Sequence, residues 1–315
     1  MILAENLTKH YGQHVAINRL NFSIDRGEIL GFLGPNGAGK STTMNIITGY
    51  LSATEGKVTI DGLDVLEHAE EVKRKIGYMP EQPPLYLDMT VTNYLKFVSE
   101  LKKVPKKQFK EDLDRILDLV KITDVSKRLI KNLSKGYRQR VGLAQSLIGN
   151  PEILILDEPT IGLDPKQIIE IRNLINTLKK EHTIVLSSHI LPEVSAVCER
   201  VLIINKGNIV ASDTVENLSR GLIGGNRFSL RVKGEGQEIE NAIKSVDGVA
   251  SVESSISPET GAVDVVVEAK DERDLRADVF FALSRISCPI LIMRPLDMTL
   301  EEIFLQMTRS EAEVS

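Results

Sequence analysis

The segment GPNGAGKST at residues 34–42 decides how this chain of 315 residues is expected to fold. It fits the pattern G-x-x-x-x-G-K-[S/T], with the strand-like EILGFL before it and the helical TTMNIITGYL after it. The glycines of such a loop allow backbone N–H groups to face a phosphate at the positive end of the following helix. The segment therefore predicts a phosphate-binding loop formed by Gly34, Pro35, Asn36, Gly37, Ala38, Gly39, Lys40, Ser41 and Thr42.

Three side chains of this loop are expected to contact a nucleotide and its metal. Lys40 is expected to contact the β- and γ-phosphates, Ser41 to place its hydroxyl on Mg²⁺, and Thr42 to bond the α-phosphate side. A glycine-rich turn that binds nothing is the alternative. The flanking strand and helix favour the phosphate site.

A second chemical element is the run ILILDEP at residues 153–159. Its four apolar residues predict a strand buried in a sheet, and the strand ends in two carboxylates. Asp157 is expected to reach Mg²⁺, usually through water, whereas Glu158 is placed to polarise the water that attacks a γ-phosphate, as a general base. Two acids that merely cap a strand end are the alternative.

Composition restricts the class of protein. With 42% hydrophobic and 26% charged residues, the chain has the composition of a folded protein of about two domains. No apolar run approaches the ~18 residues of a membrane helix, and the N-terminal MILAENLTKHYG has no signal-peptide form, so we expect a cytoplasmic location. The two cysteines, Cys198 and Cys288, have no CxxC spacing, which argues against a disulfide framework or zinc site. The net charge of −5 does not indicate a nucleic-acid surface.

Residues 1–220 are expected to form one α/β domain, because strand-like and helical runs alternate along them. A mostly helical stretch at about 80–145 interrupts this rhythm and predicts an inserted helical subdomain. The strands are expected at Glu28–Leu33, Ile153–Leu156, Thr183–Ser187 and Arg200–Asn205, and the helices include Phe109–Val120 and Lys166–Leu178.

A second domain is expected at residues 227–315, after the glycine-rich SRGLIGGN at residues 219–226. Its order β-α-β-β-α-β resembles a ferredoxin-like module. A last helix is expected from Thr299, because Thr299 and Glu302 fit a capping box. The strands are expected at Arg227–Val232, Gly248–Ile256, Ala262–Glu268 and Pro289–Met293, and the helices at Glu238–Val246 and Asp271–Ile286.

The segment LSKGYRQR at residues 133–140 resembles the LSGGQ signature of ABC transporter ATP-binding subunits. Together with the phosphate-binding loop and ILILDEP, it makes residues 1–220 resemble an ABC cassette. The resemblance implies a P-loop ATPase fold with ATP and Mg²⁺ as cofactors. Lys135 and Tyr137 depart from the family's pattern, whereas Ser134 and Gly136 match it.

The resemblance also implies that two cassettes pair head to tail, so that Ser134 and Gly136 of one chain cap the γ-phosphate held by the other. By the same resemblance, Tyr11 stacks on adenine, Asp164 crosses the dimer interface and His189 contacts the γ-phosphate. Taken alone, each of these residues has an ordinary structural alternative: a capped helix start, a core or surface tyrosine, or a satisfied polar side chain at a strand end.

The segment after IGYM at residues 76–79 leaves a choice open. The family places a glutamine directly after the proline, but this chain has Pro80, Glu81 and Gln82. Either side chain could approach Mg²⁺ and water, and we favour Gln82 because a neutral amide adds no negative charge beside ATP. The following PPLYLDMT at residues 83–90 is either a packed loop or part of a socket for a membrane subunit's coupling helix.

Taken together, these features favour an ATPase subunit that acts as a dimer and powers transport through a separate multi-span permease on the inner face of the cell membrane. The chain resembles most closely the branch that serves exporters of drugs, antibiotics or polysaccharides and gliding motility. Whether the second cassette is identical or a paralogue stays open. A non-transport ABC ATPase is the alternative, although the paired cassettes or long coiled coils of such relatives are not found. The C-terminal domain is expected to dock, to regulate or only to stabilise.

Overall fold

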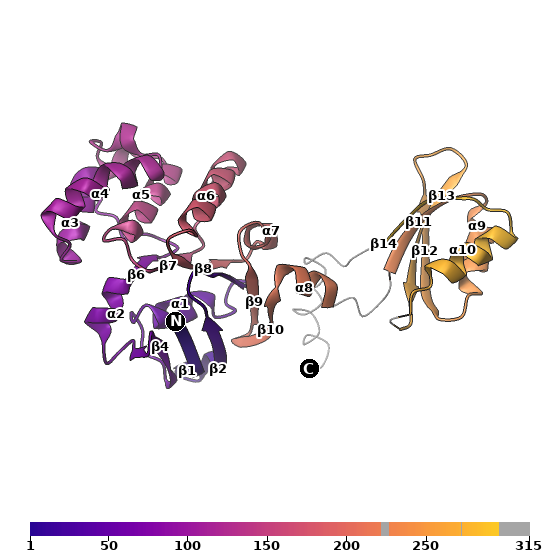
Figure 1. Cartoon of the computed structure of the whole chain (residues 1–315), viewed down its shortest axis with the longest axis horizontal. Coiled ribbons are helices and arrows are strands. Elements are labelled where there is room, and N and C mark those ends of the chain that lie inside the picture. The colour runs from indigo at the N-terminus through magenta and orange to yellow at the C-terminus, as the bar shows by residue number, and fades with distance from the viewer. Residues whose placement is uncertain (222–226, 272, 296–315) are drawn as a thin grey trace. The chain divides into compact units, whose positions relative to one another are not determined.

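The computed structural model describes residues 1–221, 227–271 and 273–295 (Figure 1). It forms two compact units, Met1–Val215 and Glu216–Ser315. The division lies shortly before the glycine-rich segment at which the sequence predicts a boundary. Over the described ranges, we find no helix with the length and apolar character that a membrane span requires.

A six-stranded sheet forms the centre of the first unit, in the order β10-β9-β3-β8-β7-β6. All neighbours are parallel except β10, which runs antiparallel to β9. Parallel strands place their carboxyl ends at one edge, where ligands of open α/β sheets bind. Four strands confirm the sequence-based prediction, with ends that differ by a residue at most. The strands are β3 (Ile29–Leu33), β6 (Ile76–Met79), β7 (Ile153–Asp157), β8 (Thr183–Ser188), β9 (Arg200–Asn205) and β10 (Asn208–Thr214).

An antiparallel sheet, in the order β2-β1-β4-β5, packs against helix α1 and the central sheet. Leu7 and Ile17 of this sheet share one hydrophobic core with Met44 of α1 and Phe32 of β3. The phosphate-binding loop connects β3 to α1, so this shared core holds in place the elements on both sides of the loop. The elements are β1 (Ile2–Tyr11), β2 (His14–Ile24), β4 (Glu55–Ile60), β5 (Leu63–Asp64) and α1 (Lys40–Ile47).

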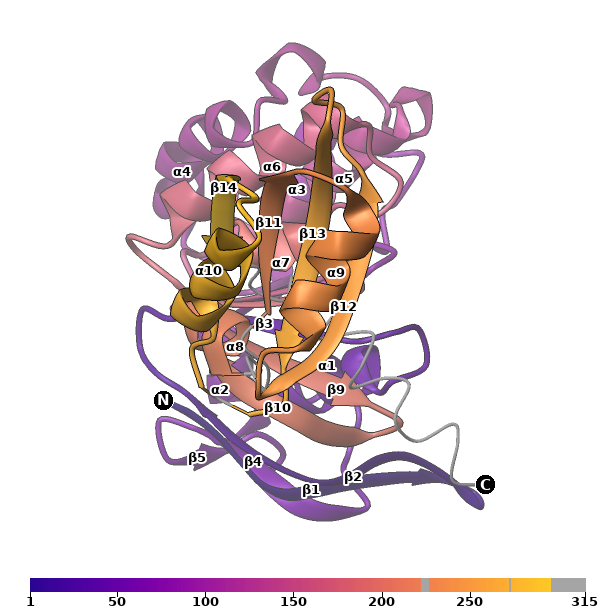
Figure 2. The same ribbon diagram turned by 90° about the vertical axis from the view of Figure 1, so that its right-hand side faces the viewer.

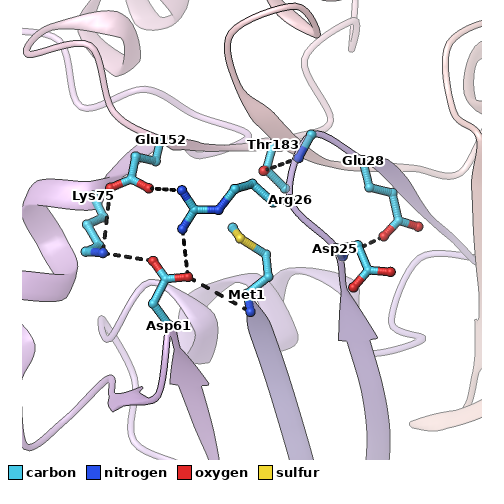
Figure 3. Close-up of polar contacts among 9 residues, drawn as sticks. Met1, Asp25, Arg26, Glu28, Asp61, Lys75, Glu152 and Thr183 are labelled. Carbon is cyan, nitrogen blue, oxygen red and sulfur yellow. Dashed lines mark hydrogen bonds and ion pairs between the residues drawn. The ribbon is translucent and has the colours of Figure 1, made fainter.

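A cluster of charged side chains ties the two sheets together at the amino ends of the central strands (Figure 3). Asp61, in the turn between β4 and β5, contacts Arg26 at 3.0 Å and Lys75 at 2.8 Å. Arg26 also contacts Glu152, which directly precedes β7, at 3.0 Å. Lys75 ends helix α2 (Ala69–Lys75), and its hydrogen bond holds the pKa of the Asp61 carboxyl below its usual value. This network lies at the edge opposite the phosphate-binding loop.

The insertion between β6 and β7 is mostly helical, and its helices gather beside the central sheet (Figure 1). Val91, Tyr94 and Leu95 of α3 are buried, as are Ile116 and Leu117 of α4. The insertion contains α3 (Val91–Leu101), α4 (Lys106–Leu119), two short 3₁₀ turns (Thr123–Val125 and Ile130–Asn132) and α5 (Lys135–Leu147). The helices that follow are α6 (Pro165–Leu178), α7 (Leu191–Ser195) and α8 (Val215–Gly221).

From β11 onward, the second unit has the β-α-β-β-α-β order, and its sheet runs β12-β13-β11-β14 with antiparallel neighbours. Helices α9 and α10 lie on one face of this sheet (Figure 2), over a core that contains Phe228, Leu230 and Val265. The elements are β11 (Arg227–Lys233), α9 (Gly236–Lys244), β12 (Val249–Ile256), β13 (Ala262–Ala269), α10 (Arg276–Arg285) and β14 (Ile290–Pro295).

Helix α10 begins later than the sequence predicts. The carboxylates of Asp271 and Asp274 accept hydrogen bonds from the backbone N–H groups of Arg273 and Arg276, at 3.1 and 3.0 Å. Such local bonds offer the backbone an alternative to a helix, so the regular turns begin only at Arg276. The helix expected from Thr299 lies outside the described residues.

Candidate nucleotide-binding site

A pocket of about 380 Å³ lies over the phosphate-binding loop, at the carboxyl edge of the central sheet. Its lining comes from four segments that are distant in the sequence: the β1–β2 hairpin, the loop with the start of α1, the end of β6 and the end of β7. The lining residues are Tyr11, His14, Ala16, Asn36, Gly37, Gly39, Lys40, Ser41, Thr42, Glu81, Glu158 and Ile161. Eight of the predicted site residues, among them Tyr11, Lys40 and Glu158, therefore line one pocket.

Backbone geometry explains why the loop needs Gly39. This residue has φ 108°, and a Cβ atom there would lie 2.7 Å from the carbonyl oxygen of Ala16. Only glycine adopts this conformation without strain and leaves room for the neighbouring strand. Gly39 directly precedes α1, so the first N–H groups of that helix are available to an anion.

Lys40 lies almost fully buried at the floor of the pocket, with 5% of its surface exposed. Its Nζ donates hydrogen bonds to the carbonyl oxygens of Gly34 at 2.8 Å and Pro35 at 3.3 Å. The same Nζ lies 3.3 Å from Oε1 of Glu158. The cation is thus surrounded by oxygen atoms, the environment that phosphate oxygens can also provide.

Glu158 contacts both Lys40 and His189. Its Oε2 lies 2.9 Å from Nδ1 of His189, which follows the end of β8. The backbone N–H of Glu158 donates to the carbonyl and the hydroxyl oxygen of Ser187, at 3.2 and 3.0 Å. Glu158 has φ 49°, a conformation that L-residues rarely adopt. The two hydrogen bonds to Ser187 in β8 therefore hold Glu158 in an unfavourable backbone conformation.

Asp157 is 2% exposed and ends β7 beside the phosphate-binding loop. Burial raises the pKa of its carboxyl, and hydrogen bonds from the hydroxyls of Ser187 and Ser41 oppose this shift. A nearby cation would compensate the buried charge. Carboxylate and hydroxyl oxygens fit Mg²⁺, which in nucleotide sites takes one or two carboxylates together with phosphate oxygens.

The residues after β6 differ from the expectation. Glu81 lines the pocket, whereas Gln82 is exposed and lies outside its lining. The structure therefore places the carboxylate of Glu81, rather than the favoured amide of Gln82, beside the site.

The signature segment lies outside this pocket, at the start of α5. Ser134 is the N-cap of α5 and accepts a hydrogen bond from the backbone N–H of Tyr137 at 3.4 Å. A Cβ atom on Gly136 would lie 2.7 Å from the amide group of Gln167, in the first turn of α6. Asp164 caps α6 by accepting a bond from Gln167 N at 2.9 Å. Ser134 and Asp164 are both exposed in this chain.

Tyr11 and its neighbours form the open side of the pocket. Tyr11 is 50% exposed, and Nζ of Lys9 lies 5.5 Å from the centre of its ring. His14 lies opposite Tyr11 in the hairpin register and lines the pocket with Ala16. Sequence reasoning missed His14 and Ala16. The short Gly12-Gln13 connection between two strand-like runs was the signal that could have placed His14 beside Tyr11.

Comparison with known proteins assigns this architecture to a family. The family model described as ABC transporter matches residues 17–161. The lantibiotic transport ATP-binding protein SrtF of Streptococcus pyogenes is 40% identical over 69% of this chain and 94% of its own length. The bacitracin transport ATP-binding protein BcrA of Bacillus licheniformis is 37% identical over 70% of this chain and 72% of its own length.

A solved structure agrees with these relatives. It is a dimeric, post-hydrolysis state of an ATP-binding cassette bound to ADP and Pi, with a TM-score of 0.63 and 27% identity over 68% of this chain and 98% of the other. The pocket over the phosphate-binding loop thus belongs to a fold that binds and hydrolyses ATP. The chain is therefore a member of the ABC transporter family, as an ATP-binding and ATP-hydrolysing subunit.

Proposed function

We propose that Glu158 is the general base for hydrolysis. The observation that carries this proposal is the position of its carboxylate, between Lys40 Nζ at 3.3 Å and His189 Nδ1 at 2.9 Å. When ATP binds, Lys40 would exchange Glu158 for the β- and γ-phosphate oxygens, which leaves Oε1 free to accept a proton. Water then attacks the γ-phosphorus, the bond to ADP breaks, and the water proton passes to Glu158. His189 would hold the γ-phosphate.

We propose that the rest of the pocket binds ATP and Mg²⁺. The loop from Gly34 to Thr42 would hold the phosphates and Tyr11 would stack on the adenine. Ser41 and Asp157 would hold Mg²⁺, with a contribution from the segment after Pro80. The metal would neutralise charge that develops on the phosphate oxygens.

The site is completed, in this proposal, by a second chain. Ser134 and Gly136 lie outside the pocket that holds Lys40, and Ser134 and Asp164 are exposed. Head-to-tail pairing would place the N-terminus of α5 of one chain on the γ-phosphate bound by its partner, because a helix N-terminus favours an anion. Two ATP molecules would then lie between two chains.

A second groove is a candidate docking site for the permease. A groove of about 420 Å³ is lined mostly by aromatic and apolar side chains, among them Pro84 and Tyr86 of the proline-rich segment. Tyr86 packs edge-on against Phe97, with ring centres 5.3 Å apart. We propose that a permease segment inserts here, which would hold the subunit on the cytoplasmic face of the membrane. The other lining residues are Thr48, Tyr50, Lys73, Ile76, Tyr78, Tyr94, Val98, Leu101, Lys102 and Gln145.

The transported compound is proposed from the relatives alone. The names of two of them state transport of bacitracin and of a lantibiotic. We propose export of a compound of this antibiotic class. Deleting the gene should make cells more sensitive to such compounds, and the Lys40→Ala variant should fail to restore resistance. Unchanged sensitivity across a panel of antibiotics would contradict this assignment.

The nucleotide site is tested directly with the purified chain. Lys40→Ala should weaken binding of a fluorescent ATP analogue, because it removes the phosphate-binding cation. The control is Lys57→Ala, since Lys57 is an exposed lysine of β4 that pairs with Glu5 at 3.3 Å and lies outside the pocket. Equal binding by both variants would show that the nucleotide does not occupy this pocket.

A further inference from the structure

A carboxylate outside the pocket connects the two loops that carry Glu158 and His189. Glu193 of α7 is 4% exposed, and its Oε2 accepts a hydrogen bond from the hydroxyl of Thr160. The same oxygen accepts a second bond from the hydroxyl of Ser188 at 3.3 Å. Thr160 and Ser188 are 6% and 1% exposed, so all three polar groups are shielded from water.

The two hydroxyls belong to the segments that position the proposed catalytic pair. Thr160 lies two residues after Glu158, and the backbone N–H of Ile161 bonds back to the carbonyl of Glu158 at 3.1 Å. Ser188 directly precedes His189, and its Oγ also accepts a bond from the backbone N–H of Ile190 at 3.0 Å. The carboxylate of Glu193 thus connects both segments from outside the nucleotide pocket.

We infer that Glu193 is a positioning residue for hydrolysis, which sets the contact between Glu158 and His189 by bridging Thr160 and Ser188. This inference rests on the proposed roles of Glu158 and His189. Buried polar groups that lose a partner are costly, so the two segments would rearrange if Glu193 were apolar. Because a base displaced by about 1 Å from its water can lose roughly 100-fold in rate, a small rearrangement would be visible in turnover.

The test compares two substitutions of similar size in the full chain. Glu193→Leu removes the acceptor oxygen, and we expect kcat for ATP to fall by about 10- to 100-fold, with KM changed by less than about two-fold. Glu193→Gln keeps an oxygen that can accept from both hydroxyls, and it should recover kcat to within about three-fold of the parent. Ser195→Ala is the control, since Ser195 Oγ donates to Leu191 O at 3.0 Å, within α7.

A double variant separates positioning from loss of structure. In a Glu158→Gln background the base is already absent, so adding Glu193→Leu should lower the residual rate by less than about two-fold. Equal losses in both backgrounds, or a kcat for Glu193→Leu equal to that of Ser195→Ala, would overturn the inference. If Glu158→Gln itself turned over at the parent rate, the proposed role of Glu158 would fail instead.

A second pair of substitutions covers the case in which Glu193→Leu does not fold. Thr160→Val and Ser188→Ala each remove one hydroxyl and leave the carboxylate in place. We expect each to lower kcat by about three- to ten-fold without weakening binding of a fluorescent ATP analogue. Parent-like turnover in both variants would overturn the inference.

Discussion

The Nζ atom of Lys40 lies 3.3 Å from Oε1 of Glu158, and both side chains are almost fully buried. The ammonium group of Lys40 therefore pairs with the carboxylate of Glu158, the proposed general base. The contact occupies Oε1, the oxygen that would accept the proton of the attacking water in the proposed mechanism. Phosphate oxygens that attract Lys40 would therefore also free Oε1 of Glu158 for the attacking water.

Replacing Glu158 by glutamine should keep ATP binding but lower turnover by at least about 100-fold, because the variant keeps the shape and removes the proton acceptor. Phosphate release measures turnover, and gel filtration with Mg-ATP should show an accumulated dimer. A glutamine variant that hydrolyses ATP as fast as the parent would exclude this role.

The two residues after Pro80 can be separated by alanine substitution. Glu81→Ala should lower kcat by roughly ten-fold, because Glu81 lines the pocket and would position water or the metal. Gln82→Ala serves as the matched comparison and should change kcat by less than about two-fold. A larger loss for Gln82→Ala would restore the preference that the sequence suggested.

Glu81 and Gln82 illustrate what the sequence alone cannot predict, namely which of two adjacent polar side chains lines the pocket. The phosphate-binding loop and ILILDEP could be predicted because, in each, the functional side chains and the flanking elements lie in one continuous stretch of chain. The choice between Glu81 and Gln82 depended on which way each side chain points in the bend after Pro80, and that direction shows only in three dimensions. His14 was missed for a different reason: the Gly12-Gln13 connection was not interpreted as a hairpin turn, and the pairing of β1 with β2 across it brings His14 to the pocket.

The fold of the second unit was predictable because its apolar residues alternate along each strand. Phe228, Leu230 and Val232 all face the same core. The start of α10 was not predictable from periodicity, since the carboxylates of Asp271 and Asp274 compete locally for the backbone. Glu193 carried no motif signal, because its partners lie in two other segments.

Composite sites can be tested by mixing two inactive variants. Ser134→Arg should block the proposed contact with a partner's γ-phosphate, and Lys40→Ala should remove the chain's own phosphate contact. A mixture contains heterodimers with one intact site and one doubly damaged site, so ATPase activity should partly recover. Full activity of either variant alone, or no recovery in the mixture, would contradict head-to-tail pairing.

Lys102 predicts a pH dependence of stability. Burial lowers the pKa of Lys102 from its usual 10.5 to about 8, so the unfolded chain binds more protons between these values. The free energy of unfolding should therefore rise with pH from about 8 to 10.5. At pH values below about 8, burial of the charged Lys102 should reduce the free energy of unfolding. Lys102→Met should flatten this rise by at most about 3 kcal/mol in urea unfolding.

The control for this measurement is Lys103→Met, a neighbouring lysine whose side chain is 68% exposed. It should keep the parent's pH dependence. Lys102 also donates a hydrogen bond to Ile148 O at 2.9 Å, and loss of that bond would shift stability at every pH without changing the slope. Identical slopes for the parent and Lys102→Met would show that Lys102 does not carry the effect.

The C-terminal unit is proposed to dock or regulate rather than to bind ATP. Ending the chain after Ser219 should leave a folded cassette, because the first compact unit ends at Val215. ATP affinity should stay within about two-fold, whereas dimer stability or coupling to the permease should change. A truncated chain that is folded by circular dichroism but no longer binds ATP would place the domain boundary elsewhere.

The left-handed backbone of Glu158 has a consequence for engineering. An L-residue at φ 49° destabilises the folded chain by about 1–2 kcal/mol, whereas glycine adopts this conformation freely. Substitution by glycine should relieve this strain and also delete the carboxylate that we propose as the base. Directed evolution for heat resistance alone would thus tend to enrich inactive chains at this position, so any such screen needs a parallel assay of ATP turnover.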